Sequence, residues 1–87
     1  MTTKIKDAIA GYSDGSQKDI TAFCTDFTPE RLSLSVEERD LKEILSSTVV
    51  SVRLPGIYPL RDYIFNPKNI ANLHRAEGKA DFELIHF

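Results

Sequence analysis

Alternation of apolar and polar residues predicts most of the strands of this protein. Residues 31–36 read Arg-Leu-Ser-Leu-Ser-Val and residues 80–84 read Ala-Asp-Phe-Glu-Leu, so every second side chain faces one side of an extended chain. Residues 48–54 contain three valines, which favour a strand. Residues 20–27 are rich in Thr, Phe and Ile, and a turn separates them from residues 31–36. We therefore expect strands over residues 20–27, 31–36, 48–54 and 80–86, the first two forming a hairpin.

Residues 36–46 have the pattern of an amphipathic helix. The spacing of Ser35 and Glu38 is that of a capping box at a helix start, and Glu38 and Lys42 are spaced for an exposed ion pair. The apolar residues of the segment form one stripe: Leu41, Ile44 and Leu45. A helix over residues 36–46 is the prediction.

A second segment carries the end signals of a helix. Asn66-Pro67 combines a helix-capping residue with a proline at the first helical position, and Gly78 stands where a terminal glycine is common. These signals predict a helix over residues 66–78. The preceding segment, residues 58–65, fits both a helical turn and a strand, and we assign it to a short helix on the spacing of Leu60, Tyr63 and Ile64.

The chain begins with apolar residues at helical spacing, Ile5, Ala8, Ile9 and Tyr12. They predict a short helix over residues 3–10, and four turn formers at residues 13–16 then predict a loop. Together the elements indicate a single α+β domain over residues 1–87. We expect a small two-layer fold of about four largely antiparallel strands, with two or three helices on one face of the sheet.

The amino-acid composition is that of a chain that folds. It has 87 residues, 11 Lys+Arg, 13 Asp+Glu and 41% hydrophobic residues, which is close to the globular average and sufficient for one packed core. No stretch has the length and apolarity of a signal peptide or a membrane-spanning helix. With a single cysteine, no internal disulfide is possible. We expect a cytoplasmic protein with no membrane partner.

The residues that carry catalysis or metal chemistry are sparse. Cys24 has Asp26 two residues away, which would raise the pKa of its thiol, and a small buried side chain is the preferred interpretation. His74 and Glu77 share a face of the expected C-terminal helix, but His86 is the only other imidazole, and a metal site needs three or four ligands. We therefore predict no catalytic residues, no metal and no cofactor, so the protein is not expected to be an enzyme.

One region departs from the average composition. Residues 53–68 combine cationic and aromatic side chains, the types that protein interfaces concentrate. We predict a non-enzymatic protein-binding domain, a regulator or inhibitor that occupies a surface of a larger protein partner, of the kind found among phage or mobile-element proteins. Its predicted contact residues are Arg53, Tyr58, Arg61 and Tyr63. The alternative is that the aromatic residues of this region complete the core.

Other functions stay open at this point. A nucleic-acid-binding module would use the cations of the second half of the chain, Arg53, Arg61, Lys68, Arg75 and Lys79. The net charge of −2 makes that function less favoured than protein binding. An enzyme built on Cys24 or His74 is a third hypothesis, and the uneven charge along the chain would also support a homo-oligomer.

Overall fold

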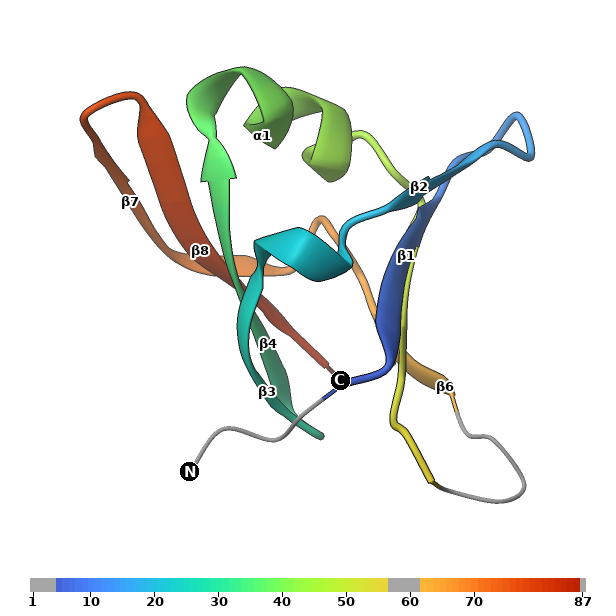
Figure 1. The fold of residues 1–87 in the computed structure, drawn as a ribbon. Helices are drawn as coiled ribbons and strands as arrows, with labels where there is room; N and C mark the ends of the chain where they lie inside the picture. Colours follow the sequence, from blue (N-terminus) through green and yellow to red (C-terminus); the bar gives the residue numbers. More distant parts are fainter. Residues whose placement is uncertain (1–4, 57–61, 87) are drawn as a thin grey trace.

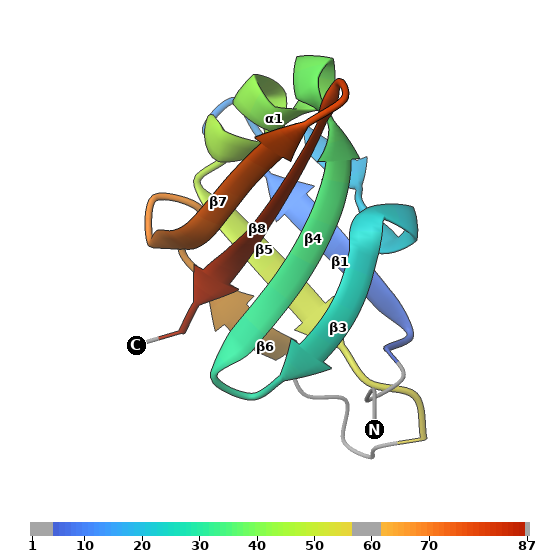
Figure 2. The same cartoon turned by 90° about the vertical axis from the view of Figure 1, so that its left-hand side faces the viewer.

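The computed structural model describes residues 5–56 and 62–86, and most of its regular structure is β-sheet. Two four-stranded antiparallel sheets form, with strand orders β2-β1-β5-β6 and β3-β4-β8-β7 (Figures 1 and 2). The strands are β1 (Asp7–Gly11), β2 (Gln17–Asp19), β3 (Cys24–Thr28), β4 (Arg31–Glu37), β5 (Val49–Arg53), β6 (Asp62–Phe65), β7 (Ile70–Ala76) and β8 (Lys79–Ile85). A 3₁₀ turn, Thr21–Phe23, and one helix, α1 (Glu38–Leu45), complete the fold.

The core lies between the two sheets. Alternate residues of β1, β4, β5 and β8 point inward, as in Ala8 and Ala10 of β1 and in Leu32 and Leu34 of β4. Aromatic rings join the sheets across this core. Phe27 of β3 meets Tyr63 and Phe65 of β6 edge-on, with ring centroids 5.3 and 6.1 Å apart.

Short hairpins form where turn chemistry was recognised in the sequence. In the predicted loop, residues 13–16, the carboxylate of Asp14 accepts hydrogen bonds from the backbone N–H and the hydroxyl of Ser16. This loop joins β1 to β2. The hairpin between β3 and β4 is also confirmed, because Thr28 pairs with Arg31 across a two-residue turn. The strands expected over residues 31–36, 48–54 and 80–86 are present as β4, β5 and β8.

The helix expected over residues 36–46 is present as α1, which connects β4 of one sheet to β5 of the other and covers one end of the molecule (Figure 1). Leu41 and Ile44 are buried. The predicted capping box is wrong, because Glu37 is the N-cap residue and makes no side-chain capping hydrogen bond. No helix in the described ranges is long and apolar enough to cross a membrane.

The predicted α+β fold class is wrong, since the described residues form two four-stranded antiparallel sheets with one short helix, and three of the expected helices contain strands instead. Residues 7–11 form β1, which pairs with both β2 and β5. Its inward-facing residues, Ala8 and Ala10, follow a period of two. The helical spacing of the apolar residues in this stretch is therefore compatible with a strand that also has apolar residues on its outer face.

The expected helix over residues 66–78 is replaced by a turn and β7. The side chain of Asn66 accepts a hydrogen bond from the backbone N–H of Lys68, which closes a turn rather than capping a helix. Gly78 has a φ of +79°, as a helix-terminal glycine would, but it forms the tight turn between β7 and β8 with Glu77, whose φ is +54°. Of the short helix expected over residues 58–65, residues 58–61 lie outside the described ranges, and the remainder forms β6.

Candidate functional site

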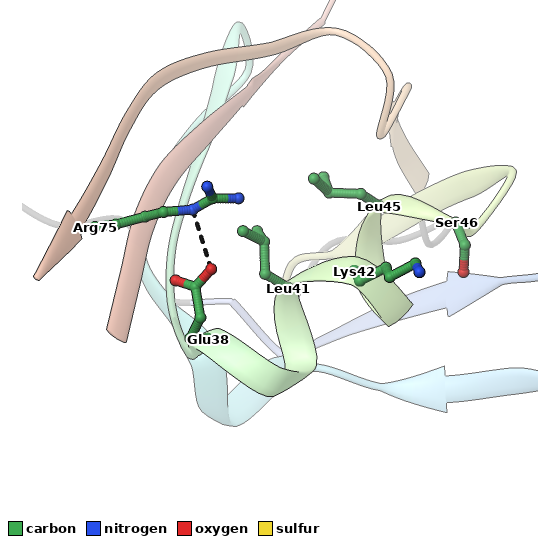
Figure 3. A pocket seen from close by; sticks show the side chains of 6 residues that line it. All are labelled: Glu38, Leu41, Lys42, Leu45, Ser46 and Arg75. Atoms are coloured by element: carbon green, nitrogen blue, oxygen red, sulfur yellow. Dashed lines mark ion pairs between the residues drawn. The ribbon is translucent and has the colours of Figure 1, made fainter. Parts of the chain in front are cut away.

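A groove of about 540 Å³ lies between α1 and the C-terminal end of β7 (Figure 3). We call it the α1–β7 groove, and its lining residues are Glu38, Leu41, Lys42, Leu45, Ser46 and Arg75. Its volume falls within the range of sites that take a small molecule or a few side chains of a peptide. It is open to solvent along one side, and Figure 2 shows α1 beside the upper ends of β4, β8 and β7.

The helix supplies one wall and the floor of the groove through a single face. Glu38, Leu41, Lys42 and Leu45 follow the i, i+3, i+4, i+7 spacing of neighbouring helix positions. Leu41 is 2% exposed and Leu45 is partly buried against the core. The two leucine side chains point into the groove from the helix (Figure 3). The floor is therefore apolar and rests directly on packed side chains.

The opposite face of α1 is fixed to the other sheet. The hydroxyl of Tyr12, next to β1, donates a hydrogen bond to the backbone carbonyl of Glu43 over 3.0 Å. Lys18 of β2 pairs with the carboxylate of the same residue, with Nζ and Oε2 3.2 Å apart. These contacts fix α1 to the sheet that contains β1 and β2, so the helix that lines the groove is held in place.

Charged side chains form the rim of the groove. Arg75 reaches across from β7, and its Nε lies 3.1 Å from Oε1 of Glu38 (Figure 3). The two side chains are 58% and 44% exposed, so this pair is weakly stabilising and easily rearranged. Lys42 adds a second cation, which gives the rim one more positive charge than negative. The spacing of Glu38 and Lys42 in the sequence predicted an ion pair between them. In the structure Glu38 pairs with Arg75 of β7 instead.

The strand beside the groove is unusually exposed. β7 is the last strand of its sheet, and its residues from Asn72 to Ala76 are all exposed. Leu73 is 44% exposed, a high value for a large apolar residue. A bulge interrupts the pairing with β8 between Ala71 and His74, and Asn72 has a positive φ of 54° there. The strand therefore has exposed side chains and an edge that no described strand covers, and its C-terminal part borders the groove.

The four contact residues predicted from the sequence do not form one described surface. Arg53 points from the outer face of β5, where its Nε lies 3.3 Å from the carboxylate of Asp62. Tyr63 sits opposite the buried Val52 and contacts Phe27, so it points to the inner face of the same sheet. Tyr58 and Arg61 lie outside the described residues. Arg53 and Tyr63 thus face opposite sides of one sheet.

The cations of the nucleic-acid hypothesis are spread over both sheets. Arg53 and Arg75 each pair with a carboxylate, in different sheets. Lys79 stands opposite Glu37 in the pairing of β4 with β8, and Lys68 lies in the turn that precedes β7. Arg61 lies outside the described residues. The described cations of this hypothesis therefore belong to different sheets and turns.

The residues of the enzyme hypothesis are also separated. Burial raises the pKa of the Cys24 thiol to about 12, and the carboxylate of Asp19 contributes to the same shift. His74 lies on β7 and Glu77 in the following turn, so the helical spacing that would bring them together does not exist. Among the residues that the structure describes, no three His, Cys, Asp or Glu side chains are placed to hold a metal ion.

The sequence predicts the helix that lines the groove but not the groove itself. The apolar stripe of α1 was visible, and Leu45 of that stripe is only partly buried because it lines the groove. The role of Arg75 could not be seen, since its segment was assigned to a helix. No protein-family model matches this chain, and no curated protein or solved structure matches it.

Proposed function

We propose that this protein is a non-enzymatic protein-binding module that takes apolar side chains of a larger partner into the α1–β7 groove. Such a module would act as a regulator or inhibitor by occupying a surface of that partner. The observation that carries the proposal is the apolar floor made by Leu41 and Leu45 in an open groove of about 540 Å³. Apolar anchors seated in pockets supply most of the free energy in protein interfaces.

The surroundings of the groove support a protein ligand. The rim carries an ion pair and a lysine, which matches the polar rim that surrounds an apolar centre in protein interfaces. Leu73, which is 44% exposed, adds apolar surface on β7, the strand that borders the groove. Of the contact residues predicted from the sequence, Arg53 would be a separate contact on the outer face of β5, and Tyr63 has no part in this proposal because it packs against Phe27.

Panning of a random 12-residue peptide library tests this function. The folded protein is the bait, and Leu45→Glu, which places a charge on the floor of the groove, is the counter-selection bait. We expect enriched peptides that bind the wild-type protein and lose at least about tenfold in affinity on the variant. Amide shifts of a ¹⁵N-labelled protein should then cluster at α1 and the end of β7.

Two controls keep the result interpretable. Lys42→Trp fills the groove from its exposed rim without touching the core, so it should block the same peptides even if Leu45→Glu is poorly folded. Lys68→Trp makes the same exchange in the turn before β7 and should leave binding unchanged. Failure to enrich any groove-dependent peptide, or shifts confined to β5 and β6, would contradict the proposed site.

A further inference from the structure

We propose that the ligand of the α1–β7 groove is an extended, acidic segment that adds to the free edge of β7 as a further strand. This inference rests on the proposed function and specifies the conformation and charge of the partner. An added strand would continue the sheet past β7, and its inward-facing side chains would lie over the leucine floor. Main-chain hydrogen bonds to the edge and one apolar side chain in the groove would then act together.

The edge of β7 is open for such an addition. β7 pairs with β8 on one side and has no described strand on its other side. From His74 to Ala76 the pairing with β8 is regular. Because alternate residues of an antiparallel strand direct their N–H and C=O groups to opposite edges, the middle residue, Arg75, presents both groups to a strand added beyond β7. This half of the strand is the part that carries Arg75 and borders the groove.

The bulge limits where a partner strand can pair. Between Ala71 and His74 the register with β8 shifts, and the side chain of Asn72 is held by a hydrogen bond to the carboxylate of Glu83. Bulges bend an edge strand and protect it from pairing along its full length. Addition is therefore restricted to the part of β7 next to the groove, although the strand is seven residues long.

Charge favours an acidic segment. Arg75 approaches Glu38 through its Nε (Figure 3), and its side chain is 58% exposed, so its terminal amino groups could also bind a carboxylate of the partner. Lys42 lies one helical turn after Glu38 on α1 and forms no ion pair among the described side chains. A segment with one apolar residue for the floor and a nearby Asp or Glu for these cations fits both features.

N-methylation of the ligand backbone tests the strand geometry. The probe is the tightest-binding peptide recovered by the panning described above. In a bound strand, alternate N–H groups face β7, so the peptide is made in two forms that carry N-methyl groups on its odd or its even residues. We expect one form to lose at least about tenfold in affinity and the other to stay within about threefold of the parent.

Other outcomes overturn the inference while leaving the proposed function intact. If the peptide binds the groove as a helix, both N-methylated forms should lose affinity. If it binds through side chains alone, neither form should lose affinity. A second copy of this chain as the natural occupant would appear as a dimer of the free protein that Lys42→Trp converts to a monomer.

The charge of the ligand is tested separately. Lys42→Glu should weaken the selected peptide by about tenfold, and Lys68→Glu, which changes the net charge equally, should change its affinity by less than about twofold. Enriched peptides without Asp or Glu, or equal effects of the two variants, would overturn the acidic assignment.

Discussion

The thiol of Cys24 shows how a side chain that is reactive in a free peptide becomes inert in this fold. Cys24 is the first residue of β3, and its sulfur lies 3.5 Å from the carbonyl oxygen of Ile20. Burial is the main reason that its pKa rises to about 12, and the charge of Asp19 adds to the effect. Asp26, which the sequence suggested as the neighbouring charge, instead accepts a hydrogen bond from the backbone N–H of Phe27.

Cys24 should therefore resist alkylation in the folded protein. At pH 8 a thiol with a pKa near 12 is ionised in roughly one molecule in 10⁴, and only the thiolate reacts. We expect modification by iodoacetamide to be slower than in the guanidinium-unfolded chain by more than about a hundredfold. Mass spectrometry measures both rates, and rapid modification without unfolding would show that the site is open.

Glu83 shows the opposite effect of structure on a carboxyl group. Hydrogen bonding from Asn72 is the largest cause that lowers its pKa, followed by a hydrogen bond and charge from Arg31, whose NH1 lies 3.0 Å from Oε2. Because the pKa in the folded state lies below that of the unfolded chain, ionised Glu83 stabilises the fold above the unfolded value. That contribution is lost as the pH falls through the folded value.

The prediction for Glu83 is a titration shift. Asn72→Ala should raise the pKa of Glu83 toward its ordinary value, since the variant removes the largest favourable contact. Carbon-detected NMR of the glutamate carboxyl groups measures the change. Gln17→Ala, an exposed position on the other sheet, should leave the titration of Glu83 where it is. An unchanged Glu83 in Asn72→Ala would remove the role assigned to the bulge contact.

At the scale of elements, the β7–β8 hairpin explains the largest error of sequence reasoning. The turn needs positive φ at both central positions, and it has 54° at Glu77 and 79° at Gly78. A glycine at this place satisfies a helix end equally well, because both require the left-handed conformation. Gly78 therefore indicates a positive φ at this position, but it does not indicate whether the preceding residues form a helix or a strand.

Substitutions in this turn should change stability in opposite directions. Glu77→Asn places a residue that tolerates positive φ at the first central position and should stabilise the protein by about 0.5 kcal/mol. Gly78→Ala should destabilise it by about 1 kcal/mol, since alanine is strained at φ 79°. Urea unfolding with a constant m-value measures both changes. Equal effects of either sign would indicate that the turn does not have this geometry.

At the scale of the whole molecule, stability depends on contacts that cross between the sheets. Phe27 belongs to one sheet and Tyr63 and Phe65 belong to the other, and their rings pack edge-on in the core. These contacts join segments more than 30 positions apart, so they form only when both sheets are in place. The aromatic residues of β6 thus contribute to the core, the alternative that the sequence had left open for them.

Tyr63 and Arg53 should consequently differ in their effect on folding. Tyr63→Ala removes a half-buried ring from the junction of the sheets and should cost about 2 kcal/mol. Arg53→Ala removes only an exposed ion pair and should cost less than about 1 kcal/mol. Thermal or urea unfolding compares the two variants. A smaller loss of unfolding free energy for Tyr63→Ala than for Arg53→Ala would contradict a role of Tyr63 in the core.

The sequence by itself determined the elements whose signals are local. The alternation in β4 and β8, the valines of β5 and the stripe of α1 predict their structure, because period and residue type act within a few positions. Whether residues 7–11 and 70–76 are strands was decided by tertiary structure. β1 lies between β2 and β5, and β7 lies beside β8, and these partners satisfy backbone groups that a helix would satisfy internally.

The candidate site was likewise decided by tertiary structure. Leu41 and Leu45 lie on a helix that the sequence predicted, but the groove exists only because the end of β7 lies near α1 and places Arg75 opposite Glu38, 37 positions earlier in the chain. A contact between such distant residues depends on how the sheets pair, which no local period encodes. The physical reason is that a groove belongs to the space between elements, and that space is set by packing.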